Sequence, residues 1–330
     1  MTIPKNMRAA FIRKTGSVEE IMVGKLPVPC PGPTDVLVRM EASEANFVDL
    51  FVRSGAYQTH TPFPFIIGRD LVGAVAEIGS GVGRFSVGDS VWCNSLGHAG
   101  RQGAWAEYAI VPEDRLYPLP IGVDAKQAVA VLHAAATAHI GLVREAKLAA
   151  GETVFVEGGG GAVGSAVVQL ATAMGARVIA SDSQEDGEWC RSCGAEVVFD
   201  YHLKDLYEQV RVTAPGGVDV WWDTSGRNDF THCLPLLAFG GRALIMSGLS
   251  GASPVLPVGA LYTHELTLHG FAISNATVTD LAAAAATINR LLAAGRLKAR
   301  IGASYKLADA VRAQADLESH KVRGRIVVVP

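Results

Sequence analysis

The spacing of apolar residues divides the chain into two regions. In the first 125 residues, short apolar runs are separated by glycine and proline turns, which is typical of short strands joined by irregular loops. The clearest runs lie at residues 36–40, 71–78, 90–93 and 105–111. From about residue 124, helical segments alternate with apolar strands, which predicts a parallel sheet with helices on both faces. We therefore expect an α/β fold with a β-rich domain and a doubly wound domain of about six strands.

A glycine-rich loop lies inside the second region. A strand at 153–156 leads into Gly159–Gly164, which holds the pattern G-x-G-x-x-G, and an apolar helix and a second strand at 177–181 follow. In such a unit the glycines permit a tight turn, the approach of a pyrophosphate and close packing of helix on strand. The N-terminus of the helix attracts the anion. The sequence therefore predicts a dinucleotide site, whose expected contacts are Gly159, Gly161, Ala162, Val163 and Gly164.

Asp182 ends the second strand, and its charge affects whether NADH or NADPH is bound. A carboxylate at this place accepts hydrogen bonds from the adenosine ribose. Residues 181–188 hold four carboxylates and no Lys or Arg. A carboxylate about 5 Å from a phosphate costs about 3 kcal/mol at an effective dielectric near 20. We therefore expect NADH to be favoured, with NADPH as the alternative if Arg323 or Arg325 reaches the site; Ser247, after a later strand, is assigned to the same site.

Length and composition limit the class of protein. At 330 residues, two domains are expected. A net charge of −3 gives no reason to expect nucleic acid, and no apolar run is long enough for a membrane helix. The five cysteines do not suggest a disulfide framework, and Cys190 and Cys193 are interpreted as structural residues of a helix. We predict a cytoplasmic protein with a small-molecule substrate.

With these motifs placed, the chain resembles the medium-chain dehydrogenase/reductase superfamily, and within it the zinc-independent quinone oxidoreductase (zeta-crystallin-like) branch. The landmarks that carry the resemblance are Asn46–Asp49, Arg53–Tyr57, Gly79–Val82, Val87–Val91, Gly103–Tyr108, Thr137, the glycine loop, Asp223–Gly226 and Gly324–Val327. The resemblance implies a GroES-like catalytic domain made of residues 1–125 and 273–330, a Rossmann domain of residues 126–272 inserted between them, and a cleft for the nicotinamide. A homodimer is also implied, with residues 266–271 as a candidate pairing edge.

Zinc ligands of the superfamily are replaced in this chain. Where zinc alcohol dehydrogenases carry a cysteine, this chain has Asn46, and where they carry histidine it has Arg69. Only His133 of the three positions could bind the metal, and a catalytic zinc needs three protein ligands. We interpret Arg69 and Asp70 as a structural pair and His133 as a packed residue. No zinc is expected.

Without a metal, alcohol oxidation is poorly supported, whereas hydride addition to a quinone or an α,β-unsaturated carbonyl needs only a placed hydrogen-bond donor. The resemblance implies that Tyr57 is the proton donor, that Asn46 contacts the nicotinamide ribose or the substrate, and that Thr137 lies near the cofactor. Tyr57 could instead be an aromatic side chain that only packs. Phe51 stands where quinone reductases often have a second tyrosine, which leaves the quinone specificity open.

Other functions remain open on the sequence alone. The alternatives are an enoyl-thioester reductase, a zinc-free enzyme similar to alcohol dehydrogenases, and a non-catalytic, crystallin-like protein that binds dinucleotide.

Overall fold

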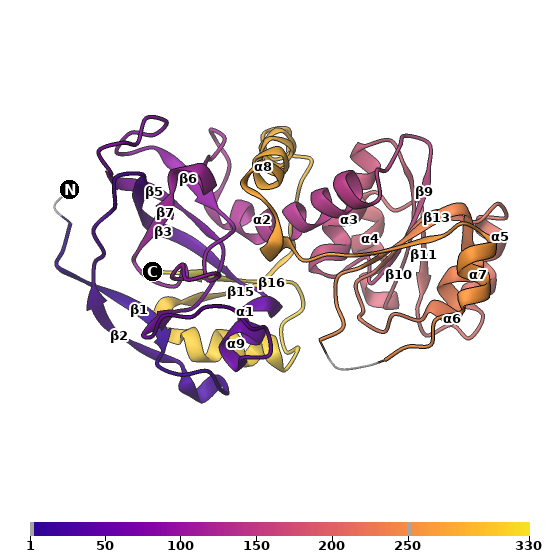
Figure 1. Cartoon of the computed structure of the whole chain (residues 1–330), viewed down its shortest axis with the longest axis horizontal. Helices are drawn as coiled ribbons and strands as arrows, with labels where there is room; N and C mark the ends of the chain where they lie inside the picture. Colours follow the sequence, from indigo (N-terminus) through magenta and orange to yellow (C-terminus); the bar gives the residue numbers. More distant parts are fainter. Residues whose placement is uncertain (1–2, 250–252) are drawn as a thin grey trace. The chain divides into compact units, whose positions relative to one another are not determined.

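The computed structural model describes residues 3–249 and 253–330 and divides into two compact units. The first unit comprises Met1–His133 with Thr277–Pro330, and the second comprises Ala134–Ala276 (Figure 1). The junctions predicted from the sequence, 125/126 and 272/273, lie a few residues earlier in the chain. The first observed junction falls inside the helix α2 (Ala125–His139), because the helical pattern runs through it.

The first unit is built on a seven-stranded sheet with the order β15-β16-β3-β5-β6-β8, in which β7 also pairs with β3. Its strands are β3 (Asp35–Ala45), β5 (Leu71–Ile78), β6 (Ser90–Cys93), β7 (Tyr108–Pro112), β8 (Tyr117–Pro118), β15 (Ile301–Lys306) and β16 (Arg325–Val329). A second sheet, of order β2-β1-β4, consists of β1 (Asn6–Ile12), β2 (Met22–Pro27) and β4 (Phe65–Ile66). The helices of this unit besides α2 are α1 (Phe47–Ser54), α8 (Val278–Ala293) and α9 (Ala310–Glu318).

The strand predicted at 105–111 begins later, at Tyr108. Trp105 accepts a hydrogen bond from the amide of Ala10 at 2.8 Å and donates its own amide to Ile67 at 2.9 Å. Ala106 forms an isolated bridge with Ala9. These residues are therefore extended, as the apolar pattern indicated, but their backbone groups bind the β1 and β4 side of the unit before β7 joins β3.

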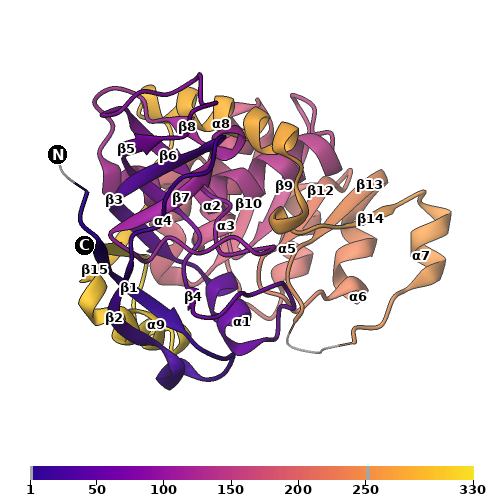
Figure 2. The same cartoon turned by 60° about the vertical axis from the view of Figure 1, so that its left-hand side comes forward.

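The second unit holds a six-stranded parallel sheet with the order β11-β10-β9-β12-β13-β14, which confirms the predicted doubly wound fold. Its strands are β9 (Thr153–Glu157), β10 (Arg177–Asp182), β11 (Val197–Asp200), β12 (Val218–Asp223), β13 (Leu237–Ile245) and β14 (Thr267–Gly270). Its helices are α3 (Ala162–Ala173), α4 (Gly187–Cys193), α5 (Leu206–Thr213), α6 (Phe230–Cys233) and α7 (Val258–Thr263). The helices α3 and α4 lie on one side of the sheet, and α5, α6 and α7 lie on the other (Figures 1 and 2).

Parallel pairing brings the ends of three strands of the second unit to one edge of the sheet. β9 is flanked by β10 and β12, and these strands end at Glu157, Asp182 and Asp223. Ligands of open α/β sheets bind outside this carboxyl edge. The two cysteines of the C-x-x-C pattern, Cys190 and Cys193, are buried in α4, and neither is in a disulfide. Among the described residues, no helix is both long and apolar enough to cross a membrane.

Both ends of the chain contribute to the core of the first unit. The Arg53 side chain, which is 1% exposed, donates from Nη1 to Gln314 Oε1 and from Nη2 to the Glu318 carboxylate, each at 3.1 Å. These bonds connect α1 to α9, about 260 residues apart in the sequence. Removing a buried charged partner leaves the groups that faced it unsatisfied.

We therefore expect Arg53→Ala to lower the free energy of unfolding by about 3 kcal/mol, measured by chemical denaturation. Arg312→Ala is the matched control, because Arg312 on α9 is exposed and pairs at 3.5 Å with Asp316 of the same helix instead of connecting two helices. That control is expected to change stability by less than about 0.5 kcal/mol. If both substitutions lowered the free energy of unfolding equally, the hydrogen bonds between α1 and α9 would stabilise the protein no more than the Arg312 side chain does.

Candidate functional site

The glycine loop of the second unit connects β9 to α3. Gly158 has φ 75°, a left-handed conformation, and a Cβ there would lie 2.4 Å from Thr224 Oγ1. The sequence assigned the tight turn to Gly159. Gly159 instead lets the loop approach β10 closely, since a Cβ added at Gly159 would lie 2.8 Å from the Cβ of Ala180 on β10. Gly158 was missed because it is the first of four consecutive glycines and the spacing alone does not tell them apart.

The third glycine of the pattern explains how closely α3 approaches the loop. A Cβ on Gly164 would lie 1.9 Å from the carbonyl oxygen of Gly158, so no larger residue fits without moving the backbone. Gly161 is the N-cap of α3, and its carbonyl accepts the amide of Ser165. The first amides of a helix have no partners within it, so those of Ala162 and Val163 face the loop as donors for an anion. This cradle fits the pyrophosphate of a dinucleotide.

Asp182 is joined to the same loop. Its Oδ2 accepts the amide of Gly160 at 2.7 Å, and its Oδ1 accepts the amide of Ser183 at 2.7 Å. A carboxylate has about four acceptor positions, so both oxygens can accept further bonds from ribose hydroxyls. The side chain thus holds the loop and presents negative charge at the end of β10.

Thr137 and Ser247 also belong to the second unit. Thr137 is buried in α2. Ser247 follows β13, and its carbonyl accepts from Asn228 at 3.1 Å. The Ser247 hydroxyl is buried and makes no hydrogen bond with the described residues. It lies beside Gly226, whose Cβ would be 3.2 Å from it.

Asn46 lies in the first unit, where both ends of its amide are hydrogen-bonded. It caps α1 through a capping box with Asp49, whose carboxylate accepts a hydrogen bond from the backbone amide of Asn46 at 2.8 Å. The side-chain Nδ2 donates to Asp70 Oδ2 at 2.5 Å, and Oδ1 accepts from Arg325 Nη2 at 2.9 Å. Arg325 also forms an ion pair with Glu44. The network that surrounds Asn46 therefore defines which end of the amide is the donor and which the acceptor.

Burial dominates the electrostatics of this network. It raises the pKa of Asp49 to about 7, raises the pKa of Asp70 well above its ordinary value, and raises the pKa of Glu44 despite the adjacent Arg325. Burial also lowers the pKa of His133 well below its ordinary value, so this histidine is neutral at physiological pH. The His133 Nδ1 lies 3.9 Å from Asp70 Oδ1.

Arg69 is fully buried in the same network. Burial lowers its pKa, while Asp49 first, then Asp70 and Tyr57, favour its charged form. The sequence paired Arg69 with its neighbour Asp70, but Asp49 has the larger influence on Arg69. Within residues 3–249 and 253–330, no three His, Cys, Asp or Glu side chains are grouped so that they could hold a metal ion.

Tyr57 follows α1 and is half-buried against the core of the first unit. Its ring faces that of His98 edge-on, with centroids 5.7 Å apart. Tyr57 also favours the charged form of the buried Arg69. Among the described residues, the Tyr57 hydroxyl has no hydrogen-bond partner. The sequence missed His98, because its contact with Tyr57 depends on how two loops about forty residues apart pack together.

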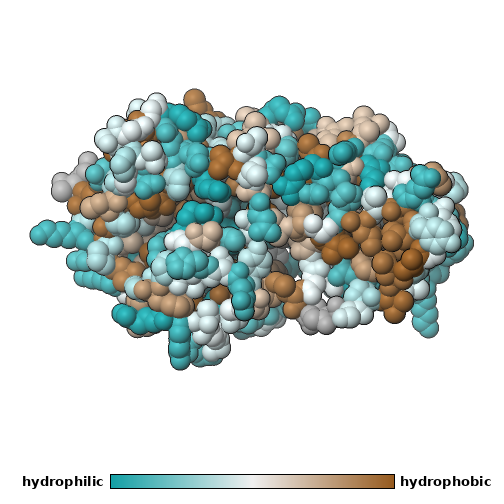
Figure 3. Space-filling model, viewed as in Figure 1, coloured by the Kyte–Doolittle hydropathy of each residue, from teal (hydrophilic) through white to brown (hydrophobic). Residues whose placement is uncertain are grey.

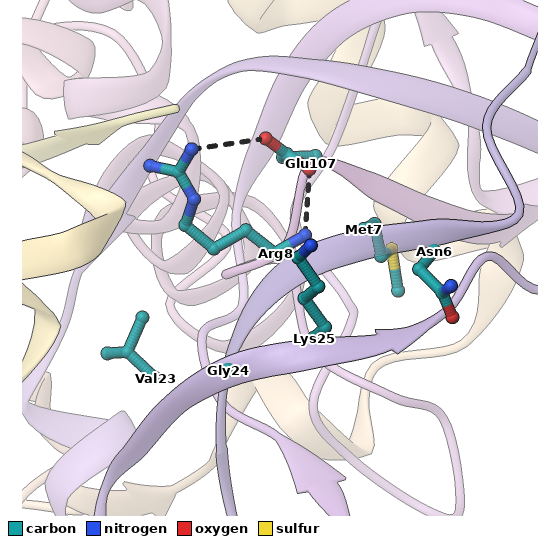
Figure 4. Close-up of a pocket in the computed structure, with 7 residues that line it drawn as sticks. All are labelled: Asn6, Met7, Arg8, Val23, Gly24, Lys25 and Glu107. Carbon is teal, nitrogen blue, oxygen red and sulfur yellow. Dashed lines mark hydrogen bonds and ion pairs between the residues drawn. The ribbon is translucent and has the colours of Figure 1, made fainter.

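A surface pocket of about 390 Å³ lies elsewhere on the first unit, at the hairpin of β1 and β2 (Figure 4). Arg8 Nη2 lies 3.9 Å from Glu107 Oε1 at its wall, and Lys25 faces Arg8 across the two strands. None of the predicted site residues lines this pocket, so we assign it no part in the chemistry.

Comparison with known proteins gives two domain matches. Residues 32–121 match an alcohol dehydrogenase GroES-like domain, and residues 162–290 match a zinc-binding dehydrogenase domain. The quinone oxidoreductase of Rattus norvegicus is 30% identical over 316 residues, which are 95% of this chain and 94% of that protein.

Two solved structures have the same fold over almost the whole chain. An NAD-dependent alcohol dehydrogenase has a TM-score of 0.90 and 31% identity, over 98% of this chain and 100% of that one. A mycobacterial protein complexed with NADPH has a TM-score of 0.85 and 30% identity, with the same coverage. The chain therefore belongs to the medium-chain dehydrogenase/reductase superfamily, in its quinone oxidoreductase branch.

Proposed function

We propose that the protein is a zinc-independent reductase that uses a nicotinamide cofactor to reduce quinones or α,β-unsaturated carbonyls. The observation that carries this proposal is the Tyr57 hydroxyl. It makes no hydrogen bond to a described residue, and Tyr57 interacts electrostatically with Arg69. The glycine loop and the N-terminus of α3 support cofactor binding. The quinone oxidoreductase relatives support the substrate class.

In this proposal the bound nicotinamide supplies the hydride, and the chain supplies the proton and the charge stabilisation. Hydride adds to the β-carbon of the conjugated double bond, and negative charge moves to the carbonyl oxygen. Tyr57 donates a hydrogen bond and then its proton to the acceptor, and water returns a proton to the phenolate. Arg69 stabilises that phenolate, because a buried cation interacts strongly with a nearby anion. The product is the saturated carbonyl compound or the hydroquinone.

We assign Asn46 to positioning the nicotinamide ribose or the substrate. Arg325 and Asp70 hold its amide, yet one Nδ2 hydrogen and one Oδ1 lone pair remain for a ligand. Thr137 and Ser247 are proposed as further cofactor contacts. The absence of zinc is likewise a proposal, supported by the residues at positions 46 and 69, since neither an amide nor a guanidinium suits the metal.

Tyr57→Phe tests the proton donor. We expect kcat/KM for an enone to fall about a hundredfold, because a positioned general acid contributes a factor of about 10²–10⁴. The dissociation constant of the reduced cofactor should stay the same. Tyr262→Phe, at an exposed tyrosine of α7, is the control and should have no effect. Full activity of Tyr57→Phe would mean that Tyr57 only packs, and activity confined to aldehydes and stimulated by zinc would contradict the proposed function.

We propose NADH as the preferred cofactor, on the charge of Asp182. Two similar structures carry opposite descriptions, one NAD-dependent and one complexed with NADPH, so the family leaves the choice open. The carboxylates near Asp182 support NADH, and so does Arg325. This arginine could have neutralised a ribose phosphate, but it is engaged with Glu44 and Asn46.

Steady-state kcat/KM for the two cofactors tests this preference. We expect the value for NADH to exceed that for NADPH about a hundredfold, from the charge repulsion of about 3 kcal/mol. Asp182→Asn should reduce this ratio at least about tenfold, because it removes the charge but keeps one oxygen that can accept the amide of Gly160. Glu188→Gln, on α4, is the charge-matched control. A wild-type preference for NADPH would contradict the assignment.

We further propose a cytoplasmic homodimer. None of the five cysteines, all of which the structure describes, is in a disulfide, which suits a reducing compartment. β14 is an edge strand of the second unit's sheet, and edge strands present unpaired backbone groups. Phe239, Val258 and Tyr262 of the same unit are exposed, and Figure 3 shows hydrophobic residues gathered on the right-hand part of the face it views. Edge pairing between two copies would cover these groups.

Sedimentation velocity is expected to show a dimer at micromolar concentration. Tyr262→Asp should weaken dimerisation at least about tenfold, since it places a charge in the proposed apolar contact. Val212→Asp, on the exposed face of α5, is the control and should sediment like the wild type. A monomeric wild type would contradict the proposal.

A further inference from the structure

The ring of His98 lies edge-on against the ring of Tyr57, the proposed proton donor. The ring centroids are 5.7 Å apart, and the ring planes are inclined at 64°. This arrangement places the positive edge of one aromatic ring against the negative face of the other. Both side chains are only partly exposed. The contact therefore restricts where the Tyr57 ring, and with it the hydroxyl, can lie.

Other contacts leave the far end of the Tyr57 side chain without a fixed position. The backbone of Tyr57 is held, because its amide donates to the carbonyl of Phe51 at 2.9 Å. The ring packs on the core of the first unit. The hydroxyl, however, forms no hydrogen bond with the part of the chain that the structure describes. The orientation of the phenol therefore depends on ring contacts, among them the one with His98.

His98 lies in a loop that does not keep its shape by local preference alone. Ala99, the next residue, has φ 51°, a left-handed conformation that residues with a Cβ rarely adopt. Gly97, the preceding residue, approaches another segment closely, since a Cβ there would lie 2.6 Å from the carbonyl oxygen of Gly68. Contacts outside the loop are therefore needed to hold it.

The segment that follows the proposed donor supplies such contacts. Thr59 Oγ1 accepts the amide of Ala99 at 2.9 Å, and the carbonyl of His60 accepts the amide of Gly100 at 2.9 Å. Thr59 Oγ1 also lies 3.4 Å from His98 Nδ1. The segment next to the donor in the sequence thus holds the ring that packs against the donor.

Gln102 attaches the end of the loop to the same segment. Its side-chain Oε1 accepts the amide of Ile66 at 2.6 Å, and its Nε2 donates to the carbonyls of Pro62 and Pro64, each at 3.2 Å. Its backbone carbonyl accepts the amide of Gly97 at 3.2 Å, which closes the loop. The loop is therefore organised before any ligand binds, and this lowers the cost of holding a reactive geometry.

The charge state of His98 favours packing over proton transfer. Burial lowers the pKa of His98 to about 4, and the arginines at positions 69, 101 and 115 act in the same direction. A histidine with a lowered pKa is uncharged above that value, so near neutral pH this ring is a poor base and has no readily lost proton. What remains for His98 is its shape and its contact with Tyr57.

We propose that His98 is a positioning residue for Tyr57 and holds the phenol in the orientation from which it protonates the substrate. This inference rests on the proposed function, in which Tyr57 is the proton donor. Proton transfer requires the donor to lie within hydrogen-bond distance of the acceptor. A phenol that turns away from this position spends less time in the reactive geometry, so loss of the His98 ring should lower kcat more than it changes KM.

His98→Ala and His98→Phe test this role in steady-state assays with an enone. We expect His98→Ala to lower kcat about fivefold and to change KM less than about twofold, because an edge-on ring contact contributes a factor of about two to ten. His98→Phe keeps the ring and should retain kcat within about twofold. His232→Ala is the matched control and should leave kcat unchanged, since it removes a histidine stacked on Tyr207 of the second unit, with centroids 4.3 Å apart.

Combining His98→Ala with Tyr57→Phe shows whether His98 acts through the Tyr57 hydroxyl. Once the hydroxyl is gone, removing His98 should change kcat less than about twofold, because effects on one shared interaction are not additive. A merely structural role would lower kcat equally in both backgrounds, and that result would overturn the inference. Wild-type kcat in His98→Ala, or a loss in His98→Phe as large as in His98→Ala, would also overturn it.

NMR of protein with labelled tyrosines tests the positioning without turnover. We expect Tyr57 to occupy one χ1 rotamer in the wild type and in His98→Phe, and to average among rotamers in His98→Ala. A single rotamer in His98→Ala would contradict the inference. If Tyr57→Phe is slow while His98→Ala is not, the proposed function remains and the inference fails. If the rotamers change as expected but no quinone or enone is reduced, the positioning by His98 remains and the proposed function fails.

Discussion

The first unit depends on the way its buried carboxyl groups and buried arginines face one another. Glu44, Asp49 and Asp70 are buried carboxyl groups, and Arg69 and Arg325 are the cations that face them. Removing one member would leave an uncompensated charge, which costs more than the pair contributes. The amide of Asn46 lies between Asp70 and Arg325 and bonds to both. The position that holds a zinc ligand in related dehydrogenases is thus part of a hydrogen-bonded ion network in this protein.

The second unit depends on a close contact between backbones. Gly164 lies against Gly158, and Gly159 lies against β10, so α3 starts close to the sheet edge. Asp182 then binds the amide of Gly160 from the neighbouring strand. The position of the helix N-terminus and the charge at the end of β10 are therefore linked, since one carboxylate serves both. A change of cofactor specificity at this position has to preserve an acceptor for the loop.

Short-range patterns were sufficient for much of the fold and for part of the site. The alternation of strands and helices and the glycine spacing predicted the parallel sheet, because these signals act over a few residues. Long-range contacts were not readable. The sequence paired Arg69 with the adjacent Asp70, whereas Asp49 acts on it more strongly. His98 contacts Tyr57 only through the packing of two loops. Gly158 was missed because φ cannot be assigned within a run of identical residues.

The order of the strands has a consequence for synthesis on the ribosome. The second unit is a continuous segment, Ala134–Ala276, and all its strands precede β15 and β16 in the sequence. The sheet of the first unit, by contrast, needs β16 to pair with β3, and β16 follows every strand of the second unit. Until Arg325 arrives, Glu44 has no cation to face and the amide of Asn46 has no donor for its oxygen. The inserted unit can thus fold during translation before β16 is made, while the residues around Asn46 are assembled only after β16 has emerged.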